Sequence, residues 1–165
     1  MYIIDTDALL SIPGLVQADQ LNYLLEELVE LVEDGKLCFP DYVIAECRRI
    51  ANGEDIALWV RSISGSRVHK SVAYAFTMQV MSAVPELLDE DTEDESSQVA
   101  VAAMACYASQ ALDAQDVCVV TEDRSALPTR ICLADACAEL QIQEISVMEF
   151  LKRESLSSYL LDGDA

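Results

Sequence analysis

The sequence predicts an α/β protein with three layers, in which a central, mostly parallel sheet of short strands lies between helices on both faces. Short apolar runs that suit buried strands alternate along the chain with longer segments of helical periodicity. This alternation favours parallel strands, because each parallel connection must cross a face of the sheet, usually as a helix. A length of 165 residues with 52% hydrophobic residues suits one domain with a substantial core.

The first half of the chain supplies two expected strands and the helices around them. Residues 2–4 form a short apolar run, and residues 17–34 follow a helical pattern that ends at Gly35, a typical C-cap residue. A second strand is expected at residues 37–39. It leads into a helix over residues 40–50, which begins with proline, a residue that suits the first helical turn.

The remaining elements follow the same alternation after a longer helical stretch. Two helices are expected at residues 56–64 and 69–88, on either side of a Ser-Gly-Ser turn. An acidic run at residues 89–95 precedes an alanine-rich helix at residues 96–112. The elements expected after it are a strand at 117–120, a helix near 132–140, a strand near 142–146 and a helix near 147–156.

Residues 1–156 are expected to form this single domain, and residues 157–165 to form a frayed C-terminal tail. The N-terminus has no basic region and Asp5 interrupts its apolar run, so a signal peptide is not expected. The uncharged stretch 96–112 contains Ser, Gln and Tyr, and a membrane span needs about 20 strongly apolar residues. We therefore expect a soluble, cytoplasmic protein without a membrane partner.

The six cysteines are expected to be reduced and buried, acting as small hydrophobic residues. Most of them lie among apolar neighbours, and no CxxC pair is present. His69 is the only histidine, so the spacing supports neither a zinc site nor a disulfide framework.

The chain is strongly acidic, with a net charge of -20 from 30 acidic and 10 basic residues. Such a charge argues against broad, non-specific binding to nucleic acid and permits binding to cations or to a basic partner. Half of the basic residues nevertheless lie within residues 48–70, where they form a candidate patch for binding nucleic acid; the alternative is an ordinary solvated helical hairpin. The candidate residues are Arg48, Arg49, Arg61, Arg67 and Lys70.

Acidic residues follow two of the predicted strands at the point where each strand ends. Asp5 and Asp7 come directly after the first strand, and Glu122 and Asp123 follow the apolar segment VCVV. In open parallel sheets, ligands bind at the carboxyl ends of the strands. If both strands belong to one parallel sheet, these carboxylates emerge at the same edge.

Two further carboxylates are candidates for the same site. Glu46 lies along the apolar stripe of the helix 40–50, where a negative charge is costly unless a cation meets it. An ion pair with Arg49 or Arg130 is the ordinary alternative. Glu95 extends the apolar face of the helix 96–112 at its N-terminal end, where acidic residues are also favoured by the helix dipole; Asp94 is the alternative residue there.

Four segments in this order resemble the PIN domain ribonucleases, over about residues 1–152. IIDTDALL resembles the opening strand and first metal-binding Asp of that family, FPDYVIAEC its second acidic segment, and VVTEDR its strand followed by Thr-x-Asp. The ending ADACAELQIQEISVMEFL is similar to the family's helix–strand–helix finish. The family usually has an Asp that opens the alanine-rich helix, whereas this chain has Glu95-Ser96-Ser97-Gln98 there.

The resemblance implies a PIN-like fold and a ribonuclease that hydrolyses RNA with Mg²⁺ or Mn²⁺. The implied metal ligands and catalytic residues are Asp5, Glu46, Glu95 and Asp123. The residues implied to support them are Thr6, Asp7, Asp94 and Thr121. Likeness to the compact VapC-like toxins, or to a related PIN branch, adds an antitoxin protein and a homo-oligomer as partners to be considered.

Two other functions remain open from the sequence. One is a catalytically degenerate PIN-like domain that acts as an acidic protein-interaction module, in line with the charge and the missing Asp. The other is a haloacid-dehalogenase-like phosphatase, in which Asp5 would be the nucleophile and Asp7 the acid/base. The phosphatase also needs a well-placed lysine, and the chain has only Lys36, Lys70 and Lys152.

Overall fold

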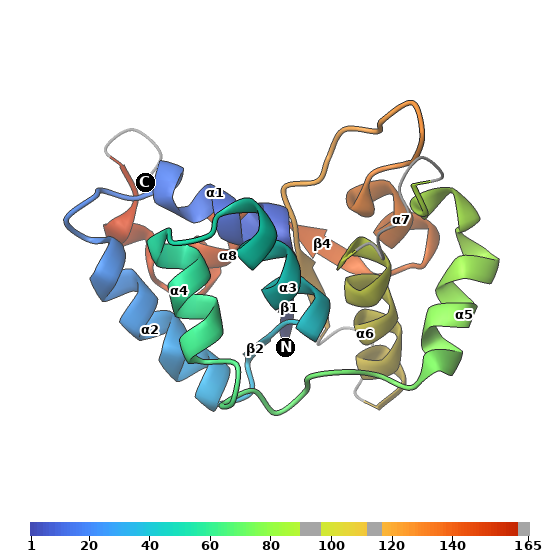
Figure 1. Ribbon diagram of the computed structural model, residues 1–165, viewed down its shortest axis with the longest axis horizontal. Helices are drawn as coiled ribbons and strands as arrows, with labels where there is room; N and C mark the ends of the chain where they lie inside the picture. Colours follow the sequence, from blue (N-terminus) through green and yellow to red (C-terminus); the bar gives the residue numbers. More distant parts are fainter. Residues whose placement is uncertain (90–96, 112–116, 162–165) are drawn as a thin grey trace.

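A parallel sheet between two layers of helices forms the centre of the protein, as Figure 1 shows. The computed structural model describes residues 1–89, 97–111 and 117–161. Within these residues, four short strands form one sheet in the order β2-β1-β3-β4, and every pairing is parallel. The strands are β1 (Tyr2–Ile4), β2 (Leu37–Cys38), β3 (Cys118–Val120) and β4 (Gln143–Ile145). The predicted three-layer α/β/α fold is confirmed.

The strand order reverses between the two central strands. The chain moves from β1 outward to β2 on one side, and from β3 outward to β4 on the other. Ile4 pairs with Val120 in the register of β1 and β3, so Asp5 and Thr121 are the first residues beyond the two strands. A reversal of this kind opens a crevice at the carboxyl ends of the strands, which is where ligands bind in open α/β sheets.

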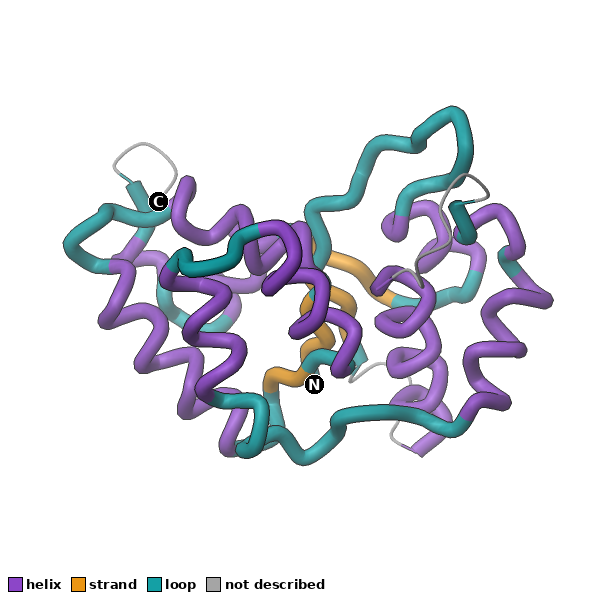
Figure 2. Tube along the Cα trace, viewed as in Figure 1, coloured by secondary structure: helices purple, strands orange, loops and turns teal. Residues whose placement is uncertain are grey.

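Helices cover both faces of the sheet. In Figure 1, α1, α2, α4 and α8 lie on one side and α5, α6 and α7 on the other, while α3 lies in front of the strands. Figure 2 shows the same two groups of helices with the strands between them. The bounds are α1 (Thr6–Leu15), α2 (Leu21–Glu33), α3 (Asp41–Ile50), α4 (Asp55–Ser62), α5 (Tyr74–Ala83), α6 (Ser97–Ala111), α7 (Leu133–Glu139) and α8 (Val147–Arg153).

Most predicted elements are present, but α1 was not predicted. This helix begins directly after Asp5 and contains Pro13 and Gly14, two residues that usually interrupt helices and hide the pattern. The prediction of one helix at 69–88 is wrong, because residues 69–73 are not helical and the rest is divided into α5 and a separate 3₁₀ turn at Pro85–Leu87. Val84, between the two, is not helical and marks the break.

The prediction of a frayed tail from Ser157 is wrong for residues 157–161. Residues Ser157–Tyr159 form a 3₁₀ turn, Leu160 is buried, and Val16 and Leu160 form an isolated antiparallel bridge. Leu161 N donates to Leu15 O at 3.0 Å, which further attaches this segment to the end of α1. Burial of Leu160 offsets the entropy cost of ordering the segment.

The cysteines and the alanine-rich helix are part of the buried core. All six cysteines are free and buried, as predicted. The alanine-rich helix α6 is buried along nearly its whole length, because its small side chains let it pack closely against β1, β3 and α7. In the parts of the chain that the structure describes, no helix is long and apolar enough to cross a membrane.

Arg67 belongs to the core and not to the predicted RNA-binding patch. It lies in the segment that connects α4 to α5, and it is only 4% exposed. Its guanidinium donates to Phe39 O and to the Asp41 carboxylate, and it lies 4.7 Å from the centre of the Phe39 ring. Because these contacts occupy the guanidinium, Arg67 is removed from the predicted set of RNA-binding residues.

Replacing Arg67 by alanine is expected to lower the free energy of unfolding by about 2 kcal/mol or more, since Phe39 O and Asp41 would lose a charged donor. Urea unfolding followed by the fluorescence of the buried Trp59 would measure the loss. The matched control is Arg61→Ala, in which an exposed arginine is removed and a change within about 0.5 kcal/mol is expected. Equal stability of both variants would contradict a structural role for Arg67.

Candidate metal centre

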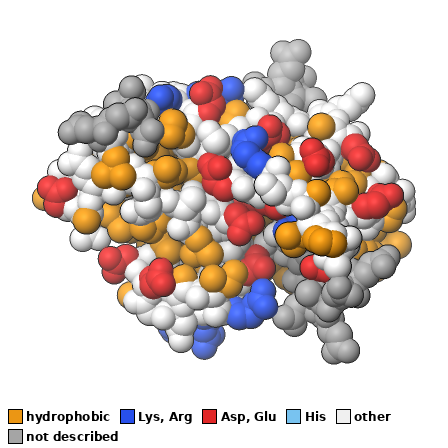
Figure 3. All heavy atoms as spheres, turned by 90° about the horizontal axis from the view of Figure 1, so that it is seen from above, with side chains coloured by type: hydrophobic (Ala, Val, Ile, Leu, Met, Phe, Trp, Pro, Cys, Tyr) orange, Lys and Arg blue, Asp and Glu red, His pale blue; other side chains and the backbone are white. Residues whose placement is uncertain are grey.

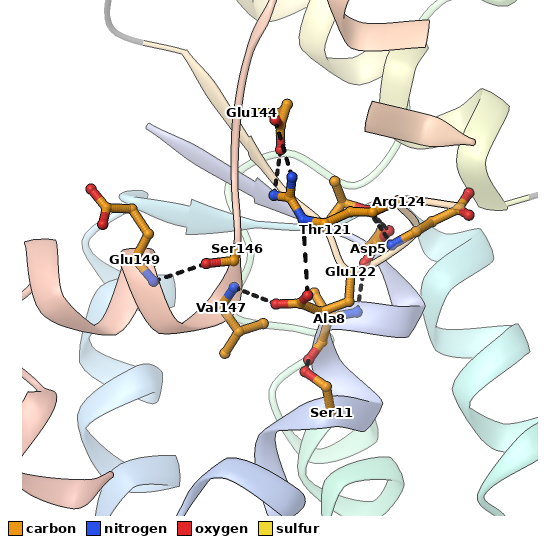
Figure 4. Close-up of polar contacts among 11 residues, drawn as sticks. Asp5, Ala8, Ser11, Thr121, Glu122, Arg124, Glu144, Ser146, Val147 and Glu149 are labelled. Atoms are coloured by element: carbon orange, nitrogen blue, oxygen red, sulfur yellow. Dashed lines mark hydrogen bonds and ion pairs between the residues drawn. The ribbon is translucent and has the colours of Figure 1, made fainter. Parts of the chain in front are cut away.

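Asp5 is a buried carboxylate at the end of β1. It is 1% exposed, and its backbone N–H donates to Val120 O at 3.1 Å, which continues the pairing of β1 with β3. Its side chain caps α1, because Oδ1 accepts from Ala8 N at 2.7 Å. The Thr121 hydroxyl donates to the other oxygen, Oδ2, as the close-up in Figure 4 shows. The strand, the helix cap and Thr121 therefore fix the Asp5 carboxylate in one orientation.

Asp123 lies two residues beyond Thr121 at the same edge of the sheet. Its backbone N–H donates to the Thr121 hydroxyl oxygen at 3.0 Å, so this hydroxyl links Asp5 to Asp123. The Asp123 Oδ2 atom accepts from Leu133 N at the start of α7 at 3.0 Å and from Arg130 at 2.7 Å. Arg130 is thus the ion-pair partner of Asp123, and the predicted alternative of a pair with Glu46 is not observed.

Glu46 reaches the same region from α3. Thr6 Oγ1 donates to Glu46 Oε2 at 2.7 Å, and the Ser97 hydroxyl at the start of α6 donates to the same oxygen. The other oxygen, Oε1, lies 3.3 Å from Arg49, which is the ion pair considered from the sequence. Since Thr6 follows Asp5 directly, this contact joins α3 to the end of β1.

Asp7 completes a set of four carboxylates, called here the carboxylate cluster: Asp5, Asp7, Glu46 and Asp123. Burial raises the pKa of Asp7, and the negative charges of Asp123 and Glu46 raise it further, while Arg130 lowers it. Among the described residues, no hydrogen bond or ion pair reaches the Asp7 carboxylate. The Asp7 carboxyl thus interacts electrostatically with carboxylates from both α3 and the loop after β3.

Burial also raises the pKa of Asp5, from its ordinary value of 3.8 to about 7. The hydrogen bonds from Thr121 and Ala8 lower this pKa, and the nearby Asp7 and Asp123 raise it. The desolvation of the charged form outweighs the two hydrogen bonds. The ionised form of Asp5 is therefore unfavourable in this buried position, and a nearby cation would stabilise it.

Of the four predicted metal ligands, Asp5 and Asp123 contact the same Thr121 hydroxyl, and Glu46 accepts from Thr6, the residue after Asp5. The fourth, Glu95, and its alternative Asp94 lie outside the described residues. Within residues 1–89, 97–111 and 117–161, no three His, Cys, Asp or Glu side chains stand in the arrangement of a metal centre. The donor chemistry nevertheless fits a hard cation, since carboxylate oxygens are what Mg²⁺ and Mn²⁺ prefer.

Ser97 and Arg130 are site residues whose roles were not predicted from the sequence. Ser97 lies in the segment where the PIN resemblance leads one to expect a carboxylate, and its hydroxyl contacts Glu46 instead. Arg130 was considered only beside Glu46, whereas it pairs with Asp123. The position of Ser97 at the start of an alanine-rich helix could have indicated its role. No local sequence pattern indicates that Arg130 pairs with Asp123.

Glu122, the other acidic residue after β3, belongs to the scaffold next to the cluster. Its Oε1 accepts from Val147 N, the first N–H of α8, at 2.8 Å, while Ser146 is the N-cap of that helix, as Figure 4 shows. Arg124 Nε lies 3.9 Å from Glu122 Oε2, and its guanidinium donates bidentate hydrogen bonds to the Glu144 carboxylate on β4. These contacts tie the loop after β3 to β4 and α8, and thereby hold Thr121 and Asp123 in place.

The face at the carboxyl ends of the strands is mixed in charge. Figure 3 views it from the side of α1 and the 121–132 loop, with acidic side chains gathered near the middle and basic ones close by. Of the predicted RNA-binding residues, Arg48 and Arg61 are exposed on either side of a small groove of about 110 Å³ between α3 and α4. Lys70 is also exposed, and its backbone carbonyl accepts from Asp41 N at the start of α3.

Little in the structure favours the phosphatase. A nucleophile must reach its substrate, whereas Asp5 is buried and both of its oxygens accept hydrogen bonds. The lysines Lys36, Lys70 and Lys152 are exposed, and none of them is among the groups that shift the pKa of Asp5. The surroundings of Asp5 therefore give the phosphatase no support.

Comparison with known proteins gives a family but no characterised relative. No curated protein and no solved structure matches the chain. The chain matches DUF4411, described as a domain of unknown function, over residues 2–158, a range that includes every residue of the carboxylate cluster and all four strands of the sheet. The protein therefore belongs to the DUF4411 family.

Proposed function

We propose that this protein is a metal-dependent ribonuclease that hydrolyses RNA phosphodiester bonds with Mg²⁺ or Mn²⁺ at the carboxylate cluster. The observation that supports it most is the buried Asp5 at the reversal of the strand order, whose pKa is raised to about 7. Carboxylates held close together and out of water lower the stability of the fold unless a cation or a proton offsets their charge. A pKa shifted by such surroundings is typical of functional sites. The order of the PIN-like segments in the sequence supports the same proposal.

In this proposal, the carboxylates bind the metal ions and the neighbouring hydroxyls orient the carboxylates. Asp5, Glu46 and Asp123 would hold the ions, and Asp7, whose pKa the charges of Asp123 and Glu46 raise, would contact them through water. The bound ions would activate a water molecule, position the scissile phosphate and stabilise the leaving oxygen. Thr121 fixes the orientation of Asp5, and Thr6 and Ser97 do the same for Glu46, because each hydroxyl donates to the carboxylate it supports.

The exposed Arg48, Arg61 and Lys70 would contact the RNA backbone around the site. They are a local exception in a chain with a net charge of -20, which would otherwise repel RNA. Arg49 forms an ion pair with Glu46, so it would contact RNA only if that ion pair opened. If the protein is a toxin, an antitoxin could inhibit it by inserting a basic side chain into the carboxylate cluster.

Calorimetric titration with Mn²⁺ tests the metal centre directly. We expect one or two sites in the wild-type protein and their loss in Asp5→Asn, at a moderate salt concentration that suppresses diffuse binding to the acidic surface. Asp19→Asn is the matched control, because it removes an exposed carboxylate and should leave these sites unchanged. Equal, weak binding to all three proteins would exclude the metal centre and with it the nuclease.

A second function has its own support in the structure. Two of the four clustered carboxylates already have a cationic partner within the chain, Asp123 with Arg130 and Glu46 with Arg49. Internal arginines in the place of metal ions would suit a domain that has lost catalysis and binds a basic protein through its acidic surface. This function predicts weak binding of Mn²⁺ and no RNA cleavage, so the same titration separates the two.

A further inference from the structure

Arg130 places a positive charge beside the carboxylate cluster. It lies in the loop between β3 and α7, and its Nη1 atom donates to Asp123 Oδ2 at 2.7 Å. The side chain of Arg130 is 11% exposed and that of Asp123 is 6% exposed, so the solvent screens this ion pair little. Arg130 also lowers the pKa of Asp7, so its charge acts on a second carboxylate of the cluster. The guanidinium thus occupies the electrostatic role that a bound cation would have.

Asp123 is held in position by contacts other than its pair with Arg130. Leu133 N donates to the Asp123 Oδ2 atom at 3.0 Å. The backbone N–H of Asp123 donates to Thr121 Oγ1 at 3.0 Å, and its carbonyl accepts from Ala134 N at 3.2 Å. Removal of Arg130 would therefore leave the Asp123 carboxylate oriented and take away only its cationic partner.

The Arg130 guanidinium is held by fewer contacts than the buried arginine of the core. Its Nη1 atom also donates to Ile131 O at 2.9 Å, and no hydrogen bond from Nε or Nη2 reaches a residue that the structure describes. Arg67, by contrast, donates from all three of its nitrogens and packs against the ring of Phe39. Arg130 can therefore leave Asp123 by a rotation of its own side chain, without a change in the core.

A metal ion and Arg130 cannot both bind Asp123 Oδ2. This oxygen already accepts from Arg130 and from Leu133 N, which uses both of its lone pairs. A divalent ion on the same carboxylate would also bring two positive charges next to the guanidinium, and like charges at such a distance repel each other.

We propose that Arg130 and a divalent metal ion compete for Asp123, so that Arg130 neutralises this carboxylate until a metal ion displaces the guanidinium. The inference rests on the proposed function and adds the regulation of the same site to it. Only the molecules in which the ion pair has opened bind the ion, so the pair lowers the apparent metal affinity by the open fraction. Arg130 would thereby set the metal concentration at which the site fills.

Calorimetric titration with Mn²⁺ tests the competition without requiring cleavage. We expect Arg130→Gln to bind Mn²⁺ about tenfold more tightly than the wild type, because glutamine is neutral and does not compete for the carboxylate. Arg153→Gln is the matched control, since it removes the same charge from an exposed position at the end of α8. Arg153 is not among the charges that shift the pKa of Asp5 or Asp7, so this control should stay within about twofold of the wild type.

A second measurement follows the guanidinium itself in the wild-type protein. The Nε–H NMR signal of Arg130, assigned with the charge-conserving variant Arg130→Lys, should shift when Mg²⁺ is added. Mg²⁺ is used because Mn²⁺ broadens NMR signals. This measurement does not depend on the folding of Arg130→Gln, in which Asp123 has lost the cationic partner of its partly buried charge.

Three results would overturn the inference: equal Mn²⁺ affinity of the wild type and Arg130→Gln, an equal gain in Arg153→Gln, or an Arg130 signal that does not respond to Mg²⁺. RNA cleavage assays of the wild type keep the two proposals apart. Cleavage together with a Mn²⁺ affinity that does not depend on Arg130 would reject only the competition. Tight binding in Arg130→Gln alone, without cleavage by the wild type, would support the competition and reject the nuclease. No binding to either protein would reject both.

Discussion

Replacing Asp5 by asparagine is expected to reduce RNA cleavage by at least about 100-fold and to leave the fold intact. Asparagine keeps the shape of the side chain, and its oxygen can still accept from Ala8 N, so α1 keeps its cap. The new amide can donate to the Thr121 hydroxyl, which has lone pairs to accept it. Only the negative charge is lost, and the metal site needs that charge.

The measurement is the rate of cleavage of a single-stranded RNA with saturating Mn²⁺, together with urea unfolding to verify the fold. Asp19→Asn, the exposed control, should cleave at the wild-type rate. A folded Asp5→Asn protein with undiminished activity would exclude the proposed mechanism. An inactive wild-type protein would favour the acidic interaction module.

The metal-free protein is expected to lose stability as the pH rises from about 4 to about 7. The folded state keeps a proton on Asp5 up to its pKa of about 7, whereas the unfolded chain releases it near the ordinary value of 3.8. The folded state thus binds more protons in this window, and the free energy of unfolding falls by up to about 1.4 kcal/mol for each pH unit. Above pH 7, Asp5 is ionised in both states and contributes no further loss.

Urea unfolding with Trp59 fluorescence at several pH values, with and without Mg²⁺, would measure this dependence. Asp5→Asn has no carboxyl at this position, so its curve should be flatter over the same window. Saturating Mg²⁺ should raise the stability of the wild type most at neutral pH, because it binds the ionised form of the folded protein. A wild-type curve that matches the variant at every pH would contradict the raised pKa of Asp5.

The sequence was sufficient for most of the architecture, for reasons that specific residues illustrate. Apolar runs such as VCVV are short, buried on both faces and separated by helical segments, and parallel strands have this pattern. Pro40 marks the start of α3 because its fixed backbone angle suits a helix start. The helix α1 could not be predicted in the same way, since Pro13 and Gly14 obscure its pattern and its stability comes from the Asp5 cap and from packing.

The sequence also brought Asp5 and Asp123 into consideration, because residues after parallel strands share one edge of the sheet. Glu46 was considered because it lies on the apolar stripe of its helix, and Thr121 because of the PIN resemblance. Their metal-binding role stays a prediction. What the sequence could not provide was the pairing of side chains far apart in the chain. Arg67 looks like a free cation in the sequence, yet it is buried against Phe39.

The sequence by itself determined the succession of the four strands, most of the helices between them and the edge of the sheet that the residues after β1 and β3 share, because hydrophobic periodicity and the rules of parallel sheets act over short stretches of chain. Only the tertiary structure decided that Arg130 pairs with Asp123 and that Ser97 contacts Glu46. These contacts join residues on separate elements, so they depend on how the helices pack on the sheet, which no local pattern encodes.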